Sequence, residues 1–136
     1  MTVDLNAGIM PFVRTKNITK VNESEYVVRT LEIMTSQKLG SAFVVDGEEK
    51  LVGVITDGDI RRRLLSDQRP AGALMIEDTA SFMTRHFKSM DAESSLNDAL
   101  ANFIKDKVWD IPIIDSKGML LGVLHLQDVL PLLVDN

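Results

Sequence analysis

A 69-residue repeat constrains the fold of this chain more than any other feature of its sequence. Residues 53–65 read GVITDGDIRRRLL, and residues 122–130 read GVLHLQDVL, a weaker copy. Gly53 matches Gly122 and Asp59 matches Asp128, and both pairs are 69 residues apart (122 − 53 and 128 − 59). Repeats decide the fold before local signals do, and two copies favour a closed pair over a solenoid. The chain is therefore expected to contain two related units.

The spacing of apolar residues predicts the same elements in both copies, which match without a gap from about residue 18 to residue 133. In the first copy it predicts a helix that starts near Asn22 and stops before Gly40. A hairpin that turns at Asp46-Gly47 follows, and then a helix over residues 57–65. In the second copy we expect a helix over residues 94–107, strands over 111–114 and 119–124, and a helix from 127 towards 133.

Each copy therefore reads strand–helix–strand–strand–helix, which predicts an α/β fold of the α+β type. The segment 67–80, which contains Pro70 and Gly72, is the expected joint between the copies. We expect a first domain over residues 11–70, linker included, and a second over residues 71–136. Two such βαββα units, related by a pseudo-twofold axis, would bury their short sheets against each other.

Composition narrows the class of protein. The hydrophobic fraction of 45% and the charged fraction of 26% are ordinary for a soluble globular domain. A net charge of −5 argues against nonspecific nucleic-acid binding, and the absence of cysteine excludes disulfides and thiolate catalysis. We find neither an apolar run of the ~18 residues that cross a bilayer nor a signal-peptide pattern at the start. A cytoplasmic protein without membrane contacts is expected.

The turn from the last strand to the last helix of each copy resembles the ribose–phosphate motif of CBS domains. These are regulatory modules that bind adenine nucleotides and related ligands, and their pattern is Gly-hydrophobic-x-Thr/Ser-x-x-Asp/Asn. Residues 53–59 match the pattern throughout. Residues 122–128 match it except that His125 stands at the place of the hydroxyl residue. Beyond the first ten or so residues, the whole chain resembles a tandem CBS-domain pair.

More closely, the chain resembles the C-terminal CBS pair of arabinose-5-phosphate isomerases of the KpsF/GutQ type. These enzymes act in the pathway to the lipopolysaccharide sugar Kdo, and they usually carry a histidine at the place of His125. A string like that of residues 56–62 also occurs in CBS pairs attached to sugar-phosphate nucleotidyltransferases, which is the alternative parent. The sugar-isomerase catalytic domain that precedes the CBS pair has no counterpart in this sequence. We therefore expect a regulatory module without catalytic residues.

The resemblance implies ligand sites in the cleft between the copies. Asp59 and Asp128 would accept hydrogen bonds from a ribose diol, as acidic residues do in dinucleotide folds. Thr56 would donate to a phosphate that also faces the start of a helix. His125 would contact the anionic part of a sugar nucleotide. The other implied contacts are His86, for base or phosphate, and the strand segments that flank the base, with Ser41, Ala42, Phe43, Ile111 and Pro112.

A second interpretation of the motif needs no ligand. Thr56 and Asp59 also form a capping-box variant, which contributes about 1 kcal/mol to helix stability. His125 is a poor N-cap, so capping explains Asp128 less well. The basic run Arg61-Arg62-Arg63 is either a solvated helix face with acidic neighbours or a phosphate clamp. Successive helical residues point about 100° apart, so at most two of the three can face one ligand.

The expected ligands are AMP, ATP, CMP or the end product CMP-Kdo, which would give feedback inhibition. We expect no required cofactor and no metal, because Asp57-Gly58-Asp59 lacks the further oxygens of a calcium loop. The expected partners are a second copy, in a homodimer, and a sugar-isomerase catalytic domain. A hypothesis from another class is a dimerisation scaffold with vestigial nucleotide clefts. Trp109 and Phe103 flank an apolar stripe and are expected in or near the core.

Overall fold

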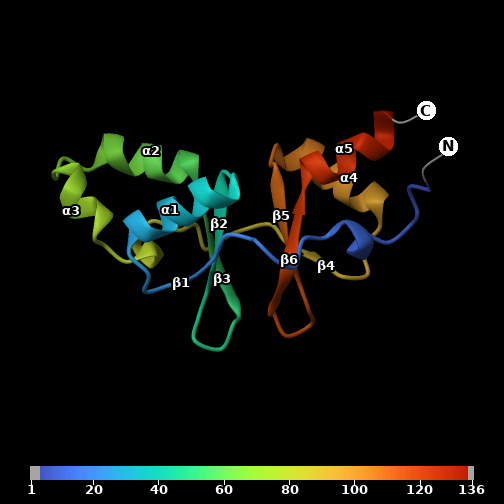
Figure 1. The fold of residues 1–136 in the computed structure, drawn as a ribbon, viewed down its shortest axis with the longest axis horizontal. Coiled ribbons are helices and arrows are strands. Elements are labelled where there is room, and N and C mark those ends of the chain that lie inside the picture. Colours follow the sequence, from blue (N-terminus) through green and yellow to red (C-terminus); the bar gives the residue numbers. More distant parts are fainter. Residues whose placement is uncertain (1–3, 135–136) are drawn as a thin grey trace. The chain divides into compact units, whose positions relative to one another are not determined.

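The computed structural model describes residues 4–134, which form two three-stranded sheets with helices (Figure 1). The α/β fold expected from the repeat is confirmed. In each sheet the first strand pairs in parallel with the second, and the second and third form an antiparallel hairpin. The first repeat supplies β1 (Lys20–Asn22), α1 (Val27–Gln37), β2 (Ser41–Val45), β3 (Leu51–Thr56), α2 (Asp57–Ser66) and α3 (Ala71–Met75). The second supplies β4 (Met90–Asp91), α4 (Leu96–Asp106), β5 (Asp110–Ile114), β6 (Leu120–His125) and α5 (Leu126–Val134).

The repeat is present in the structure with the same spacing as in the sequence. Helices α1 and α4, strands β2 and β5, and strands β3 and β6 each begin 69 residues apart (96 − 27, 110 − 41 and 120 − 51). One difference is the length of the parallel edge strand, which is three residues in β1 and two in β4. In the first repeat the Phe43 N–H donates to Thr19 O at 2.8 Å. Pro112 occupies the matching position and has no N–H to donate, which shortens the ladder.

The chain exchanges segments between its two compact units. One unit contains residues 17–87, and the other joins the segment that ends at Lys16 to the segment that begins at Lys88. Arg14 pairs with Val123 of β6 through N–H···O bonds of 2.8 and 2.9 Å, and Thr84 pairs in the same way with Val54 of β3. Each unit therefore takes the segment that precedes the other repeat. This division by contacts differs from the division at residues 70 and 71 that the repeat alone suggests.

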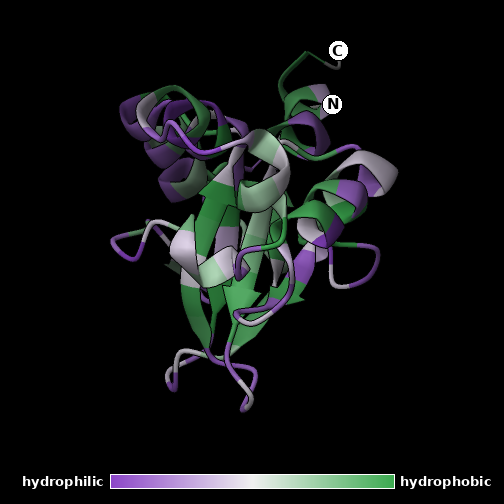
Figure 2. Ribbon diagram, turned by 90° about the vertical axis from the view of Figure 1, so that its left-hand side faces the viewer, coloured by the Kyte–Doolittle hydropathy of each residue, from purple (hydrophilic) through white to green (hydrophobic). Residues whose placement is uncertain are grey.

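Each unit has its own apolar core, and the strands carry most of it (Figure 2). Ile9, from the N-terminal segment, is 0% exposed and packs with residues of the second repeat. Leu74 and Phe82, from the segment after α2, pack with the first repeat. The exchanged segments thus complete both cores. Among residues 4–134 we find no helix with the length and apolarity to cross a membrane.

Three local expectations were wrong. The Asn22 side chain accepts from the Ser24 N–H at 2.9 Å and so closes a turn, and α1 begins only after Tyr26. Helix α1 ends at Lys38, which takes the left-handed conformation with φ 57°, so Gly40 is not the residue that stops it. Trp109 is 61% exposed, whereas Phe103 is buried as expected. Trp109 directly precedes β5 and lies outside the apolar stripe of α4.

Candidate functional site

In the first repeat, Thr56 and Asp59 form a complete capping box where β3 turns into α2. The Asp59 N–H donates to Thr56 Oγ1 at 3.2 Å, and the Thr56 N–H donates to Asp59 Oδ2 at 2.9 Å. The Thr56 hydroxyl also donates to Asp59 Oδ2, at 3.1 Å. These bonds satisfy backbone donors at the start of the helix. Capping therefore accounts for both residues, and a ligand would have to compete with these bonds.

Two further side chains contact the Asp59 carboxylate. Arg62, one turn along α2, donates through Nη2 to Oδ1 at 2.7 Å. Thr84, in the segment that crosses β3, places its hydroxyl 3.3 Å from the same oxygen. The Arg62 side chain is 64% exposed, so water can solvate its charge when it leaves the carboxylate. The Asp59 oxygens therefore carry an exchangeable cation.

In the second repeat the matching carboxylate has a different cation. Arg14 donates to Asp128 through Nε at 2.5 Å and through Nη2 at 2.9 Å, a two-point ion pair. The Asp128 carboxylate, hydrogen-bonded by Arg14, has a pKa below its ordinary value, with smaller contributions from the Arg14 and His125 charges. The same bond raises the pKa of the Arg14 guanidinium. Both side chains are thus held in their charged forms.

The two repeats place their cations on different elements. Arg62 of the first repeat corresponds to Pro131 of the second (131 − 62 = 69), which has no side-chain donor. Thr84, beside β3, corresponds in backbone pairing to Arg14, beside β6. The cation has therefore moved from the helix in the first repeat to the crossing segment in the second. Each carboxylate is neutralised, but by a side chain from a different direction.

His125 forms a cross-strand pair instead of a helix cap. Its Nδ1 is bonded to Oδ1 of Asp110, the residue opposite it in the β5–β6 ladder. The matching pair of the first repeat, Ser41 opposite Thr56, consists of two neutral side chains. Asp110 is 4% exposed and His125 14% exposed on their side chains. Beside the Arg14–Asp128 pair, the second site thus carries another acidic and basic pair.

The other predicted site residues fall into two groups. Ala42, Phe43, Ile111 and Pro112 are buried strand residues, so these positions would offer a ligand main-chain atoms. Ser41, also buried, begins β2 opposite Thr56. His86 is exposed and lies two residues after Thr84, in the unit of the first repeat. The structure therefore brings Ser41 to Thr56 and Asp59, whereas His86 belongs to the unit that does not contain β4.

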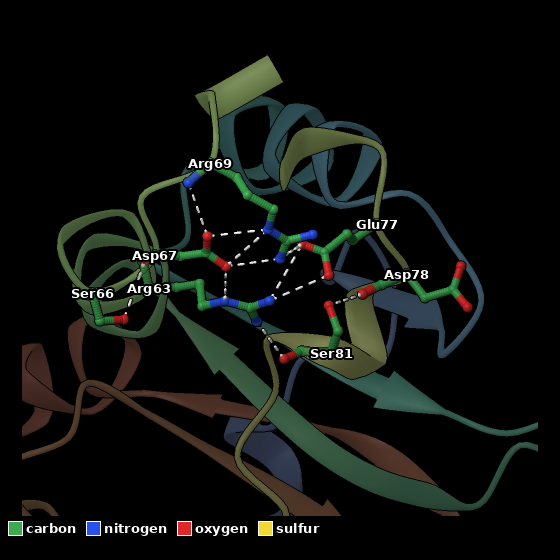
Figure 3. Close-up of polar contacts among 7 residues, drawn as sticks. All are labelled: Arg63, Ser66, Asp67, Arg69, Glu77, Asp78 and Ser81. Carbon is green, nitrogen blue, oxygen red and sulfur yellow. Dashed lines mark hydrogen bonds and ion pairs between the residues drawn. The ribbon is translucent and has the colours of Figure 1, made fainter. Parts of the chain in front are cut away.

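The basic run on α2 divides between structure and site. Figure 3 shows Arg63 between Asp67 and Glu77, where its Nη2 lies 3.2 Å from Glu77 Oε1 and its Nη1 donates to Ser81 O at 2.9 Å. Its guanidinium also lies 4.6 Å from the centre of the Phe82 ring. Arg63 thus ties α2 to the exchanged segment 77–82. Arg62 is the one of the three that contacts the Asp59 carboxylate.

The arrangement suits an anionic ligand with a vicinal diol. At each turn a carboxylate stands beside an arginine, so a diol can donate to the first and a phosphate can accept from the second. Among residues 4–134 we find no group of three or more histidines, cysteines or acids placed to hold a metal. A hollow in the second unit, lined by residues 89–93 and 114–116 and by Leu121, includes neither His125 nor Asp128. The chemistry is therefore at the strand-to-helix turns.

Sequence reasoning missed Arg14, Thr84 and the side chain of Asp110. Arg14 precedes the region where the 69-residue repeat is visible, so the motif search passed over it. A second, shorter correspondence was available, because Phe12-Val13 and Phe82-Met83 are 70 residues apart (82 − 12). That match would have placed Arg14 and Thr84 at equivalent positions. The joint substitution of Ser41 and Thr56 by Asp110 and His125 was also visible in the repeat.

Comparisons with known proteins agree with this geometry. A likeness of 34% identity over 114 residues connects the chain to an uncharacterized protein of Rickettsia prowazekii (strain Madrid E), covering 83% of this chain and 33% of that protein. The arabinose 5-phosphate isomerase GutQ of Shigella flexneri is 33% identical over 90 residues, which are 66% of this chain and 26% of that protein. The chain thus spans about a third or less of the length of these relatives.

A crystal structure of CBSX2 in complex with AMP matches with a TM-score of 0.78 at 24% identity, over 90% of this chain and 92% of that one. A family model covers both repeats separately, over residues 13–66 and 76–135, and each match includes one of the two strand-to-helix turns. The family is that of the CBS domain, and this chain belongs to it as a tandem pair.

Proposed function

We propose that this chain is a regulatory module that senses a nucleotide or nucleotide sugar at its two strand-to-helix turns. The observation that carries the proposal is the carboxylate–arginine pair at each turn, Asp59 with Arg62 and Asp128 with Arg14. Such a pair offers an acceptor for a ribose diol next to a donor for a phosphate. The AMP complex of CBSX2, a protein of the same fold, supports an adenine nucleotide as a ligand.

A thermal-shift panel tests the proposal. AMP, ATP, CMP and CMP-Kdo would each be added at millimolar concentration, because a ligand that binds only the folded state raises its stability by RT ln(1 + [L]/Kd). We expect at least one of them to raise the melting temperature in wild type. The increase should shrink in the double variant Asp59→Asn/Asp128→Asn. If none of the four shifts the melting temperature, the sensing function is wrong.

We further propose that the module controls an arabinose 5-phosphate isomerase of Kdo and lipopolysaccharide synthesis. The likeness to GutQ supports this assignment. Because the chain spans about a quarter of that relative, the sequence that flanks it in the native polypeptide decides the matter. A contiguous sugar-isomerase domain would support the proposal, and a contiguous nucleotidyltransferase would establish the alternative.

A dimerisation scaffold with vestigial sites is the second candidate, and two observations favour it. The Thr56–Asp59 capping box explains the first motif without a ligand. Helices α2, α4 and α5 expose Leu65, Ile104 and Val134 at 80%, 77% and 73%. A homodimer in analytical ultracentrifugation, together with a negative thermal-shift panel, would establish the scaffold over the sensor.

A further inference from the structure

Arg14 reaches the second-repeat site from outside the repeat. Its main chain is fixed on β6 by two hydrogen bonds with Val123, of 2.8 and 2.9 Å. The crossing is so close that a Cβ on Gly122 would lie 2.4 Å from Arg14 O. The segment is thus pinned directly beside Gly122, and the guanidinium is delivered to Asp128 from a fixed base.

The Arg14–Asp128 pair remains accessible to a ligand. The two side chains are 34% and 30% exposed, so the pair is only partly desolvated. A ligand that uses Asp128 for its diol must take oxygens that now accept from Nε and Nη2 of Arg14. That displacement leaves a guanidinium without its carboxylate in a partly buried place, which is unfavourable.

The charge of the ligand therefore decides whether the exchange is favourable. A neutral nucleoside offers the displaced guanidinium no replacement partner. A nucleoside phosphate offers its own oxygens, which suit the two-point geometry of arginine. In the first repeat the displaced cation would be Arg62, which is 64% exposed and can turn to water instead. The requirement for an anion should thus be stricter at the second repeat.

We propose that Arg14 is the specificity-determining residue of the second-repeat site, which it makes selective for nucleoside phosphates over neutral nucleosides. This inference rests on the proposed function, because it assigns the ligand class of the same site. In the empty site Arg14 neutralises Asp128. In the occupied site it transfers to the phosphate and leaves Asp128 to the diol.

The single tryptophan of the chain makes the second site separately observable. Trp109 directly precedes Asp110, and its carbonyl accepts from the Leu126 N–H at 2.8 Å, at the start of α5. Its indole is exposed, so a bound adenine should change its fluorescence. Titrations would follow this signal with AMP and with adenosine. In wild type we expect AMP to bind at least about tenfold more tightly, the equivalent of one charge-assisted hydrogen bond.

The decisive variant is Arg14→Gln, because it should move the two affinities in opposite directions. AMP loses its phosphate partner and should bind about tenfold more weakly, whereas adenosine no longer displaces a cation and should bind more tightly. A merely structural role of Arg14 would weaken both ligands together. Arg14→Lys keeps the charge and should retain part of the preference for AMP. Arg62→Gln, which removes the cation of the first repeat, should leave the Trp109 titrations unchanged.

Each outcome decides the inference. Parallel loss of both affinities in Arg14→Gln, with Arg14→Lys behaving in the same way, would overturn it. If neither probe changes the Trp109 signal or the melting temperature of wild type, the proposed function fails for adenine nucleotides. Arg14→Gln still decides the inference in that case, since new adenosine binding would support it and continued absence of binding would overturn it.

Discussion

Single residues of the motif have structural reasons that can be separated from any ligand. The two motif glycines lie where another segment crosses the third strand of each sheet. A Cβ on Gly122 would meet the backbone oxygen of Arg14 at 2.4 Å, and a Cβ on Gly53 would meet the Met83 sulfur at the same distance. A backbone held by two hydrogen bonds cannot move aside, whereas a methionine side chain can change its rotamer. The family glycine is therefore explained by close approach.

We expect Gly122→Ala to lower the free energy of unfolding by about 2–3 kcal/mol, the cost of overpacking against a fixed neighbour. Gly53→Ala should cost clearly less. Urea denaturation of both variants measures the difference. Equal effects would show that the crossing segment at β6 adapts as readily as the Met83 side chain does.

Glu49 is a residue whose type does not suit its backbone. It takes φ 69° in the β2–β3 hairpin, and Gly118 takes φ 82° at the matching place in the β5–β6 hairpin. Glu49→Gly should raise stability by about 0.5–1 kcal/mol, because the left-handed conformation costs glycine little. The exposed ion pair with Lys20 that is lost contributes little in return. Thermal melts would check this, with Gly118→Ala as the opposite control, which should destabilise.

At the level of elements, an ion cluster joins α2 to the exchanged segment that follows it. Asp67 accepts from Arg69 at 2.7 Å and from Arg63 at 3.3 Å, and both arginines also contact Glu77 (Figure 3). Hydrogen bonds from the Arg69 side chain and main chain, and then from Arg63, lower the pKa of the Asp67 carboxyl well below its ordinary value. The ionised form of Asp67 is therefore the one that stabilises the fold.

This shift predicts an acid-dependent contribution to stability. Because the folded pKa lies below the unfolded value, the contribution is present above about pH 4 and is lost as the pH falls through the folded pKa. Wild type should be more stable than Asp67→Asn at pH 7, and the gap should narrow below about pH 4. Melts at several pH values measure it. Glu32→Gln, which removes the exposed pair with Arg29, should show a small difference throughout.

Elements were predictable where the local signal was strong and repeated. The hairpins and the long helices follow from the periodicity that both copies share, and Ser95 begins α4 with the capping box that its sequence suggests. The start of α1 was wrong, because Asn22 closes a turn within the chain instead of capping the helix. Its end was wrong because Lys38, like Lys107 in α4, takes the left-handed conformation that Gly40 was expected to supply.

At the level of the whole molecule, the exchange of segments was beyond the reach of the repeat. The 69-residue match assigns each residue to a copy by its order in the chain, but a core is assembled by contacts. Ile9 belongs to the second unit although it precedes the first repeat. The same exchange conceals Arg14 from motif reasoning, because the residue that pairs with Asp128 lies 114 positions away from it.

The exchange predicts which unit each segment stabilises. Ile9→Ala should destabilise the unit of the second repeat by about 2–5 kcal/mol, since Ile9 is 0% exposed and its removal leaves a cavity. Amide hydrogen exchange should then accelerate in β5, β6 and α4 while β2 and β3 keep their protection. Leu74→Ala, at a residue equally buried in the other core, should give the reverse pattern. Faster exchange confined to residues 20–66 in Ile9→Ala would contradict the exchanged arrangement, because the N-terminal segment would then support the repeat that follows it directly.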